Sequence, residues 1–125
     1  MLTNKRIAVV GSRVFGDYDL LDNVLKEFIE PEDLIVSGGA VGADSMAQRW
    51  AKENGRSILI HYPNYALNGR VATFVRNRYI AEDAEIVLAF YAPGRFHLGG
   101  TANTVNHARE LGREIHEYEE SIHSN

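Results

Sequence analysis

The sequence of 125 residues contains no cysteine, only three prolines and a single tryptophan. The absence of cysteine excludes thiolate nucleophiles, iron–sulfur clusters, cysteine-based zinc sites and a fold held together by disulfides. A chain of this length with 45% hydrophobic residues buries enough surface to fold without such cross-links. We therefore expect residues 1–125 to form a single domain with its own hydrophobic core.

Long apolar runs and blocks of basic residues are also absent. The first apolar run, Ile7 to Val10, is too short for a signal peptide or a membrane-spanning helix, so we expect a cytoplasmic protein without a membrane partner. Thirteen Lys and Arg residues against seventeen Asp and Glu residues give a net charge of −4. This balance counts against broad electrostatic capture of nucleic acid, although a local arginine cluster can still hold a few phosphate groups.

Short β-branched or apolar runs alternate with stretches of helical spacing, which predicts repeated βα units and an α/β fold with a parallel sheet. The expected strands are Arg6–Val10, Asp33–Ser37, Ser57–His61, Glu85–Phe90 and Glu114–Tyr118. The expected helices are Leu20–Ile29, Ala43–Asn54, Val71–Glu82 and Thr101–Leu111. In the third helix, the spacing predicts a buried stripe of Val71, Val75, Tyr79 and Ile80, with Arg76 beside it. The polar tail from Glu119 to Asn125 is expected to fray.

Three glycine-containing loops directly follow predicted strands: Gly11–Gly16, Ser37–Asp44 and Gly94–Thr101. In an open parallel sheet the carboxyl ends of the strands form the edge where ligands bind, so we expect these loops to lie side by side. The second and third loops run into helix N-termini, whose free N–H groups and dipole favour an anion such as phosphate. None of the loops has the spacing of a Walker A or dinucleotide-binding motif, which disfavours a standard kinase or dehydrogenase. Tight turns alone would also explain such glycines.

Asp44 and three arginines are the candidate polar groups of this edge. The Asp44 carboxylate has three interpretations: it interacts with the helix dipole alone, it accepts hydrogen bonds from ribose hydroxyls, or it stabilises an oxocarbenium-like centre during glycosidic cleavage. Arg13, Arg76 and Arg95 are candidates for holding phosphate, because guanidinium matches an oxyanion with two parallel donors. A solvated surface arginine is the alternative for each of them.

Histidines and aromatic residues give weaker signals. His61 and His97 are placed where they could reach the cleft, whereas His116 and His123 are expected at the periphery. No His-x-x-x-His pair occurs, so we expect no metal site. Four aromatic residues that follow the third and fourth strands could stack on a base, although packing under the loops is the simpler interpretation. They are Tyr62, Tyr65, Tyr91 and Phe96.

Several short motifs occur together in the order found in one superfamily. They are Gly11-Ser12-Arg13 with Phe15 and Asp17-Tyr18, Ser37-Gly38-Gly39-Ala40 with Gly42-Ala43-Asp44 and Ala47, Arg76-Asn77, and Gly99-Gly100-Thr101. On these residues the chain resembles the YspA/YpsA-related branch of the SLOG superfamily, which also contains the DNA-processing protein A family and the Lonely Guy phosphoribohydrolases. The resemblance implies a Rossmann-like, three-layer αβα fold with a five-stranded parallel sheet in the order 3-2-1-4-5.

The resemblance also implies a ligand. Proteins of this superfamily are thought to bind nucleotides, NAD derivatives or related molecules, so the expected function is binding of a nucleotide or of an ADP-ribose- or NAD-derived ligand, as a sensor or a sequestering protein. No cofactor is assigned beyond such a ligand. The expected ligand-binding residues are Gly11, Ser12, Arg13, Phe15, Ser37, Gly38, Gly39, Ala40, Gly42, Asp44, Arg76, Asn77, Arg95, Gly99, Gly100 and Thr101.

An enzymatic alternative remains open. Lonely Guy enzymes use an arginine, which Arg76 matches, and a glutamate just after a Gly-Gly-x-Gly-Thr motif. Here Thr101 is followed by Ala-Asn-Thr, so that carboxylate is missing, and Asp44 would have to replace it. Asp44 and Arg76 are therefore the catalytic candidates of a nucleotide N-glycosidase. The resemblance further suggests a homodimer or larger homo-oligomer, whereas the net charge counts against single-stranded DNA binding as in the DNA-processing branch.

Overall fold

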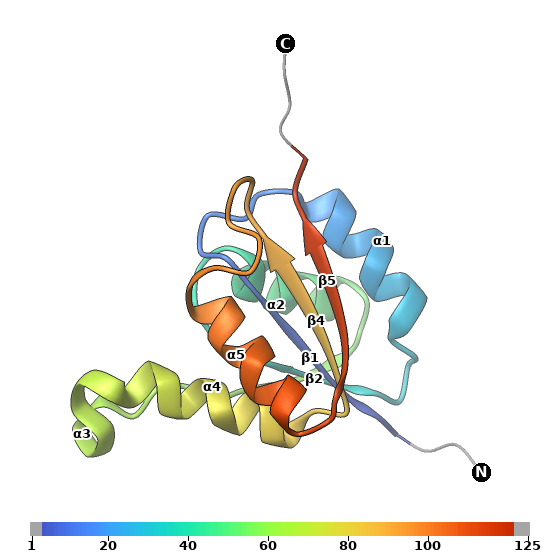
Figure 1. The fold of residues 1–125 in the computed structure, drawn as a ribbon. Coiled ribbons are helices and arrows are strands. Elements are labelled where there is room, and N and C mark those ends of the chain that lie inside the picture. The colour runs from blue at the N-terminus through green and yellow to red at the C-terminus, as the bar shows by residue number, and fades with distance from the viewer. Residues whose placement is uncertain (1–3, 122–125) are drawn as a thin grey trace.

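Within residues 4–121, which the computed structural model describes, five parallel strands form one sheet in the order β3-β2-β1-β4-β5 (Figure 1). The strands are β1 (Arg6–Gly11), β2 (Leu34–Ser37), β3 (Ser57–Ile60), β4 (Ile86–Tyr91) and β5 (Glu114–Glu119). The helices are α1 (Tyr18–Phe28), α2 (Ala43–Glu53), α3 (Tyr65–Asn68), α4 (Ala72–Asp83) and α5 (Gly99–Glu110), with a 3₁₀ turn η1 (Gly69–Val71) before α4. The predicted Rossmann-like α/β fold and its strand order are confirmed.

Alternation along the central strands sends side chains into two separate cores. Ile7 and Val9 of β1 pack on one face of the sheet, beneath α1 and α2. Ala8 and Val10 point to the opposite face, which α4 and α5 cover. Because both faces are buried, β1 is continuously apolar, as expected for a central parallel strand.

The predicted elements agree with the structure to within two residues at their ends. α1 begins earlier than predicted, because the Asp17 carboxylate accepts a hydrogen bond from the Leu20 N–H at 3.1 Å and caps the helix. β5 continues through Glu119, and the Glu120 N–H donates to the Tyr91 carbonyl oxygen at 2.8 Å, so the expected fraying does not begin there. The rest of the predicted tail, residues 122–125, lies outside the described part of the chain. The sequence pattern predicts neither α3 nor η1.

The predicted buried stripe of α4 is wrong. Val71 and Tyr79 are 53% and 55% exposed and Val75 is half-buried, so only Ile80 of the four predicted positions lies in the core. α4 instead turns Ala72, Ile80 and Ala81 inward, and Ile80 and Ala81 pack in the core against residues of the sheet and α5. The apolar stripe consequently faces outward on the segment formed by α3, η1 and α4, which we call the arm and whose α3 end lies away from the sheet (Figure 1).

Candidate functional site

The first and second glycine-containing loops meet over the start of α2. Gly42 has a φ of 77° and packs so closely on the first loop that a Cβ there would collide with the carbonyl oxygens of Ser12 and Arg13. The Ala43 N–H donates to the Ser12 carbonyl oxygen at 3.3 Å. Gly11 is equally constrained, because a Cβ there would overlap the Ala43 side chain. The packing of the two loops by itself therefore requires both glycines.

Two serines bridge neighbouring strand ends at the same edge. The Ser12 N–H donates to the Phe90 carbonyl oxygen at 2.8 Å, and its hydroxyl oxygen accepts a hydrogen bond from the Ala92 N–H at 3.1 Å. The buried Ser37 hydroxyl donates to the Val9 carbonyl oxygen at 2.8 Å. These contacts connect the first loop to the end of β4, just before the third loop, and tie the end of β2 to β1. They occupy polar groups of both serines that were expected at a ligand.

Asp44 is the buried acidic group of this edge, at 5% exposure. Its Oδ2 accepts a hydrogen bond from the Ala40 N–H at 3.2 Å, whereas its Oδ1 is buried and has no hydrogen-bond partner among residues 4–121. Burial raises the pKa of the Asp44 carboxyl to about 6, against the opposing effects of the Ala40 N–H, the positive charge of Arg76 and the nearby N–H groups of Gly38 and Gly11, neither of which reaches hydrogen-bond geometry with Oδ1. A Cβ on Gly38 would lie 2.7 Å from the Arg76 guanidinium and 2.9 Å from the Asp44 carboxylate, so these side chains crowd the loop. At pH 7 Asp44 is an ionised acceptor with one oxygen that lacks a donor.

Arg76 and Asn77 of α4 connect the second loop to α5. Arg76 donates to the Gly38 carbonyl oxygen through a terminal nitrogen and to the Asn77 Oδ1 through Nε at 2.9 Å. The Asn77 amide nitrogen in turn donates to the Gly100 carbonyl oxygen at 3.3 Å and to the Asn103 Oδ1 at 3.0 Å. The structure therefore places the predicted Arg76–Asn77 pair between two of the loops. Sequence reasoning does not identify Asn103, although its position two residues after the Gly-Gly-Thr motif is a usable signal.

The first turn of α5 carries backbone N–H groups that no side chain caps. Its N-cap residue is Leu98, which has no side-chain acceptor. The helix then begins with Gly99-Gly100-Thr101, with Gly99 at a φ of 74° and Thr101 buried. Within 4 Å, a Cβ on Gly100 would meet only the Asn77 amide nitrogen, at 3.8 Å, so the space beside this turn is open. Free N–H groups and the positive end of a helix dipole are suited to a phosphate group.

Other predicted residues occupy different surroundings. Arg13 and Arg95 are exposed, and within residues 4–121 their side chains form no hydrogen bond or ion pair, so the structure does not hold either guanidinium at the edge. Phe15, expected at the ligand, instead lies in the core, with its ring centroid 5.5 Å from that of Phe90. It anchors the first loop to the core. Gly39, at a φ of 72°, packs against Tyr62, whose ring is otherwise exposed.

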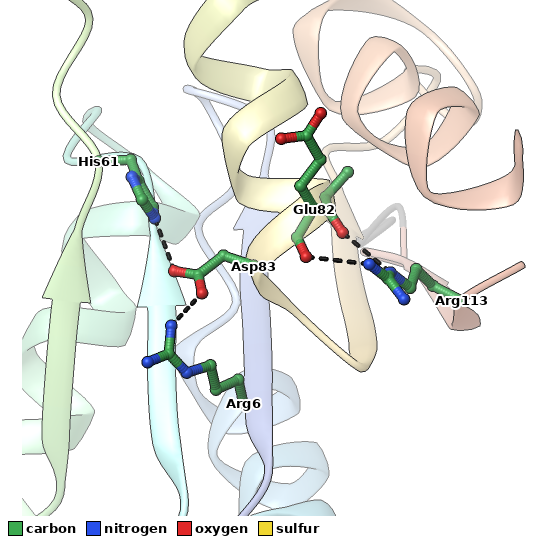
Figure 2. Close-up of polar contacts among 6 residues, drawn as sticks. Arg6, His61, Glu82, Asp83 and Arg113 are labelled. Atoms are coloured by element: carbon green, nitrogen blue, oxygen red, sulfur yellow. Dashed lines mark hydrogen bonds and ion pairs between the residues drawn. The ribbon is translucent and has the colours of Figure 1, made fainter. Parts of the chain in front are cut away.

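His61 lies against Asp83 at the end of α4 (Figure 2). Its Nε2 is 2.8 Å from one carboxylate oxygen of Asp83, and Arg6 pairs with the other. Burial raises the pKa of Asp83, but the hydrogen bonds from His61 and Arg6 outweigh it and hold the pKa below its usual range. At the same helix end, Arg113 donates to two carbonyl oxygens of the last turn, including that of Glu82 at 2.9 Å. These contacts fasten α4 to β1 and to the segments that follow β3 and α5, and they give His61 a structural partner.

A second polar cluster surrounds Glu117 of β5, which sequence reasoning does not single out. The Tyr91 hydroxyl donates to Glu117 Oε2 at 2.8 Å, His97 Nε2 lies 3.1 Å from the same oxygen, and Arg109 approaches Oε1 at 3.4 Å. Burial, followed by the Glu117 hydrogen bond, raises the pKa of Tyr91. His97 has a φ of 64°, the only positive value among non-glycine residues of the described chain. A small pocket of about 220 Å³ lies between this cluster and α5, and His97 of the third loop lines part of it.

The remaining histidines are peripheral or not described. His116 pairs with Glu114 of the same strand at 2.7 Å, and His123 lies outside the described residues. Between residues 4 and 121, no cluster of three or more potential ligand side chains is arranged to hold a metal ion. Over the same range, no helix has the length and apolar character needed to cross a bilayer.

Comparisons with known proteins bear on the family and the fold of the chain. The family model described as the YspA, cpYpsA-related SLOG family matches residues 5–67. The chain is 30% identical to the Gene 61 protein of Mycobacterium phage D29 over 95 residues, which span 69% of this chain and 76% of that protein. Its structure is similar to the X-ray structure of DNA processing protein A (DprA) from Streptococcus pneumoniae, with a TM-score of 0.76 and 24% identity. That match covers 95% of this chain but only 52% of the other, and at this identity the similarity shows only a shared fold.

Proposed function

Because this chain belongs to the YspA, cpYpsA-related SLOG family, we propose that it binds a nucleotide or an ADP-ribose- or NAD-derived ligand at the carboxyl edge of β1, β2 and β4. The ligand remains intact, so the protein acts as a sensor or a sequestering protein. Nucleotide-related binding or processing is what membership of this family suggests, and the contacts at the edge support the narrower assignment.

The observation that carries the proposal is the unpartnered Oδ1 of Asp44. A buried carboxylate oxygen without a donor is costly, and a ribose hydroxyl would satisfy it once the loop at Gly38 and the Arg76 side chain, which crowd the carboxylate, move aside. Phosphate would be repelled by Asp44, so it belongs at the open first turn of α5, where Gly100 leaves room for it. The chain of hydrogen bonds through Arg76 and Asn77 links these two subsites.

A thermal-shift experiment with mass spectrometry of the same samples tests this function. Purified protein is incubated separately with AMP, ADP-ribose, NAD and cyclic ADP-ribose. A ligand present at 100 times its Kd stabilises the native state by about 2.7 kcal/mol, which is seen as a raised melting temperature. We expect a shift with at least one of these ligands, recovered intact. The proposal fails if none of the four raises the melting temperature.

Two substitutions then test the location of the site. Gly100→Ala adds one methyl group where the protein itself has space, so the unliganded protein should stay folded while the ligand-induced shift is lost. Arg76→Ala should also remove the shift. Arg49→Ala is the matched control, because Arg49 is an exposed arginine of α2 in a surface ion pair with Glu53. An unchanged shift in Gly100→Ala would place the ligand elsewhere.

A second candidate function is hydrolysis of a nucleotide N-glycosidic bond, with Asp44 and Arg76 as the catalytic groups. It is favoured by the pKa of about 6 for Asp44, because a carboxyl that titrates near neutral pH suits acid–base chemistry. Release of free base or ribose phosphate, absent in Asp44→Asn, would identify this activity. The structurally similar DNA processing protein A is named for DNA processing, but the net charge of −4 argues against DNA binding by this chain. We therefore expect no retention on a heparin column near physiological salt.

A further inference from the structure

Two Asn-Gly pairs occur in the chain, and an arginine follows each of them. The two segments are Asn54-Gly55-Arg56 and Asn68-Gly69-Arg70. Asparagine before glycine is chemically labile, because glycine has no side chain to hinder the attack of its backbone nitrogen on the asparagine side-chain amide. The two pairs therefore share the same intrinsic reactivity toward deamidation.

The backbone of the two pairs is also nearly the same. Asn54 has a φ of −106° and a ψ of 7°, and Asn68 has a φ of −109° and a ψ of −5°. The glycine that follows is left-handed in both, with a φ of 63° at Gly55 and of 54° at Gly69. Deamidation closes a five-membered ring, which requires the glycine nitrogen to eclipse the asparagine Cβ, and these ψ values hold the two atoms apart. Each pair reacts only when its turn opens, so the free energy of local opening sets the rate.

The turn at Asn54 is fixed to the core. It closes α2, whose residues Trp50 and Ala51 are buried. The side-chain amide nitrogen and the backbone N–H of Asn54 both donate to the Trp50 carbonyl oxygen, at 2.9 Å and 3.0 Å. The Arg56 N–H donates to the Ala51 carbonyl oxygen at 2.8 Å. Opening this turn therefore disrupts core contacts, and the amide that must be attacked is itself held.

The turn at Asn68 has no such anchor. It joins α3 to η1 at the end of the arm that lies away from the sheet (Figure 1). α3 has four residues, none of them buried, and Tyr65 and Leu67 are 63% and 77% exposed. The Asn68 N–H donates to the Asn64 carbonyl oxygen at 2.9 Å, and the Gly69 N–H donates to that of Tyr65. A single exposed turn held by such bonds opens at little cost in free energy.

We propose that Asn68 is a site of spontaneous deamidation in the native protein, whereas the fold protects Asn54. The Gly69 nitrogen gives its proton to solvent and bonds to the Asn68 Cγ, and the side-chain nitrogen leaves as ammonia, which forms a succinimide. Water then opens the ring. Hydrolysis at the Cγ carbonyl gives aspartate, and hydrolysis at the backbone carbonyl gives isoaspartate.

The modification changes the outer end of the arm irreversibly. Both products carry a negative charge two residues before Arg70, where the chain had a neutral amide. Isoaspartate also adds one carbon to the backbone, which displaces the Gly69 N–H from the Tyr65 carbonyl oxygen and prevents α3 from closing. Deamidation at Asn68 thus unwinds α3 and leaves the sheet and its two cores untouched.

Peptide mapping of aged protein tests the proposal. Native protein and protein unfolded in guanidinium chloride are kept side by side in mildly alkaline buffer and digested with trypsin. The two pairs then lie in different peptides, residues 53–56 and 57–70, and mass spectrometry with fragmentation measures deamidation at each asparagine. In the unfolded protein we expect rates within about twofold of each other, whereas in the native protein Asn68 should react at least about tenfold faster than Asn54.

Removal of the α3 cap tests whether opening of this turn limits the reaction. The Asn64 Oδ1 accepts a hydrogen bond from the Leu67 N–H at 3.0 Å, so Asn64→Ala should speed deamidation of Asn68 about threefold and leave Asn54 unchanged. Asp17→Ala, which removes the equivalent cap of α1, is the matched control and should change neither rate. Equal native rates at the two pairs, or an Asn64→Ala variant that reacts no faster at Asn68, would overturn the proposal.

Discussion

Replacing Asp44 by asparagine should stabilise the protein at neutral pH and at the same time abolish ligand binding. Asparagine resembles the protonated carboxyl in shape, and its amide oxygen can still accept the hydrogen bond that Ala40 donates at 3.2 Å. It removes the buried negative charge, which the fold tolerates at a cost in stability. It also replaces one of the acceptor oxygens proposed to bind the ribose hydroxyls.

The magnitude follows from the pKa of Asp44. Burial raises this pKa from 3.8 to about 6 in the native state. At about 1.4 kcal/mol per pKa unit, the difference corresponds to a cost of roughly 3 kcal/mol for ionising Asp44 at pH 7, which is the upper limit of the gain for Asp44→Asn because asparagine keeps only one acceptor oxygen. For a domain of this size, such a gain raises the melting temperature by about 10 °C.

The pH dependence gives the sign of the effect. Between pH 4 and 6 the native state keeps the proton of Asp44 while the unfolded state has lost it, so wild-type stability falls as the pH rises through this range. The difference between Asp44→Asn and the wild type should therefore be near zero below about pH 4, grow to its full value by about pH 7, and stay constant above that. Urea unfolding of both proteins from pH 4 to 8 measures it, and other titrating groups largely cancel in the difference.

An equal difference at pH 4 and pH 7.5 would refute the reasoning, because it would mean that the charge of Asp44 costs the native state nothing. Ligand-induced thermal shifts, measured on the same preparations, separate the two roles of the residue. A stabilised Asp44→Asn variant that still binds ligand normally would leave the burial argument intact and remove Asp44 from the proposed ribose subsite.

Three further predictions concern single contacts. Asp83→Asn should destabilise the protein at neutral pH, because the charged form of Asp83 makes the contacts with His61 and Arg6. The loss of stability should shrink as the pH falls through the lowered pKa of Asp83, and urea unfolding at several pH values measures it. Gly42→Ala should lower the free energy of unfolding by about 2–4 kcal/mol, because both the φ of 77° and the collision of a Cβ with the Ser12 and Arg13 carbonyl oxygens oppose a side chain. A urea midpoint equal to that of the wild type would contradict this. Arg113→Ala should lower the free energy of unfolding by about 1–2 kcal/mol and speed amide hydrogen exchange in the last turn of α4, whose carbonyl oxygens accept its two hydrogen bonds. Faster exchange confined to other elements would show that Arg113 does not stabilise this turn.

Local patterns were sufficient to predict most of the fold. The buried strands are short apolar runs that differ from their amphipathic neighbours, so both element types and their order follow from the sequence. The four residues of α3 escape prediction because one helical turn carries too few positions to show a period. Element ends differ by one or two residues where a capping contact, such as that between Asp17 and the Leu20 N–H, decides the first turn.

The edge at which the three loops gather was predictable from the sequence, but the contacts among their residues were not. Glycines after three strands place three loops at one edge, because parallel strands all end there. The hydrogen bonds of Arg76 to Gly38 and of Asn77 to Gly100 and Asn103 join segments far apart in the chain, and no spacing rule predicts them. The same holds for Glu117, whose partners come from β4, the third loop and α5.

The sequence by itself determined the parallel α/β architecture, the edge that carries the glycine-containing loops and the identity of the family motifs, because each depends on residues close together in the chain. Only the tertiary structure decided which face of α4 is buried. Both faces of this helix carry apolar residues, so periodicity could not choose between them. The choice depends on which side chains fit against the sheet and α5, and the structure buries Ile80 with Ala72 and Ala81 there, while Val71 and Tyr79 are left on the surface.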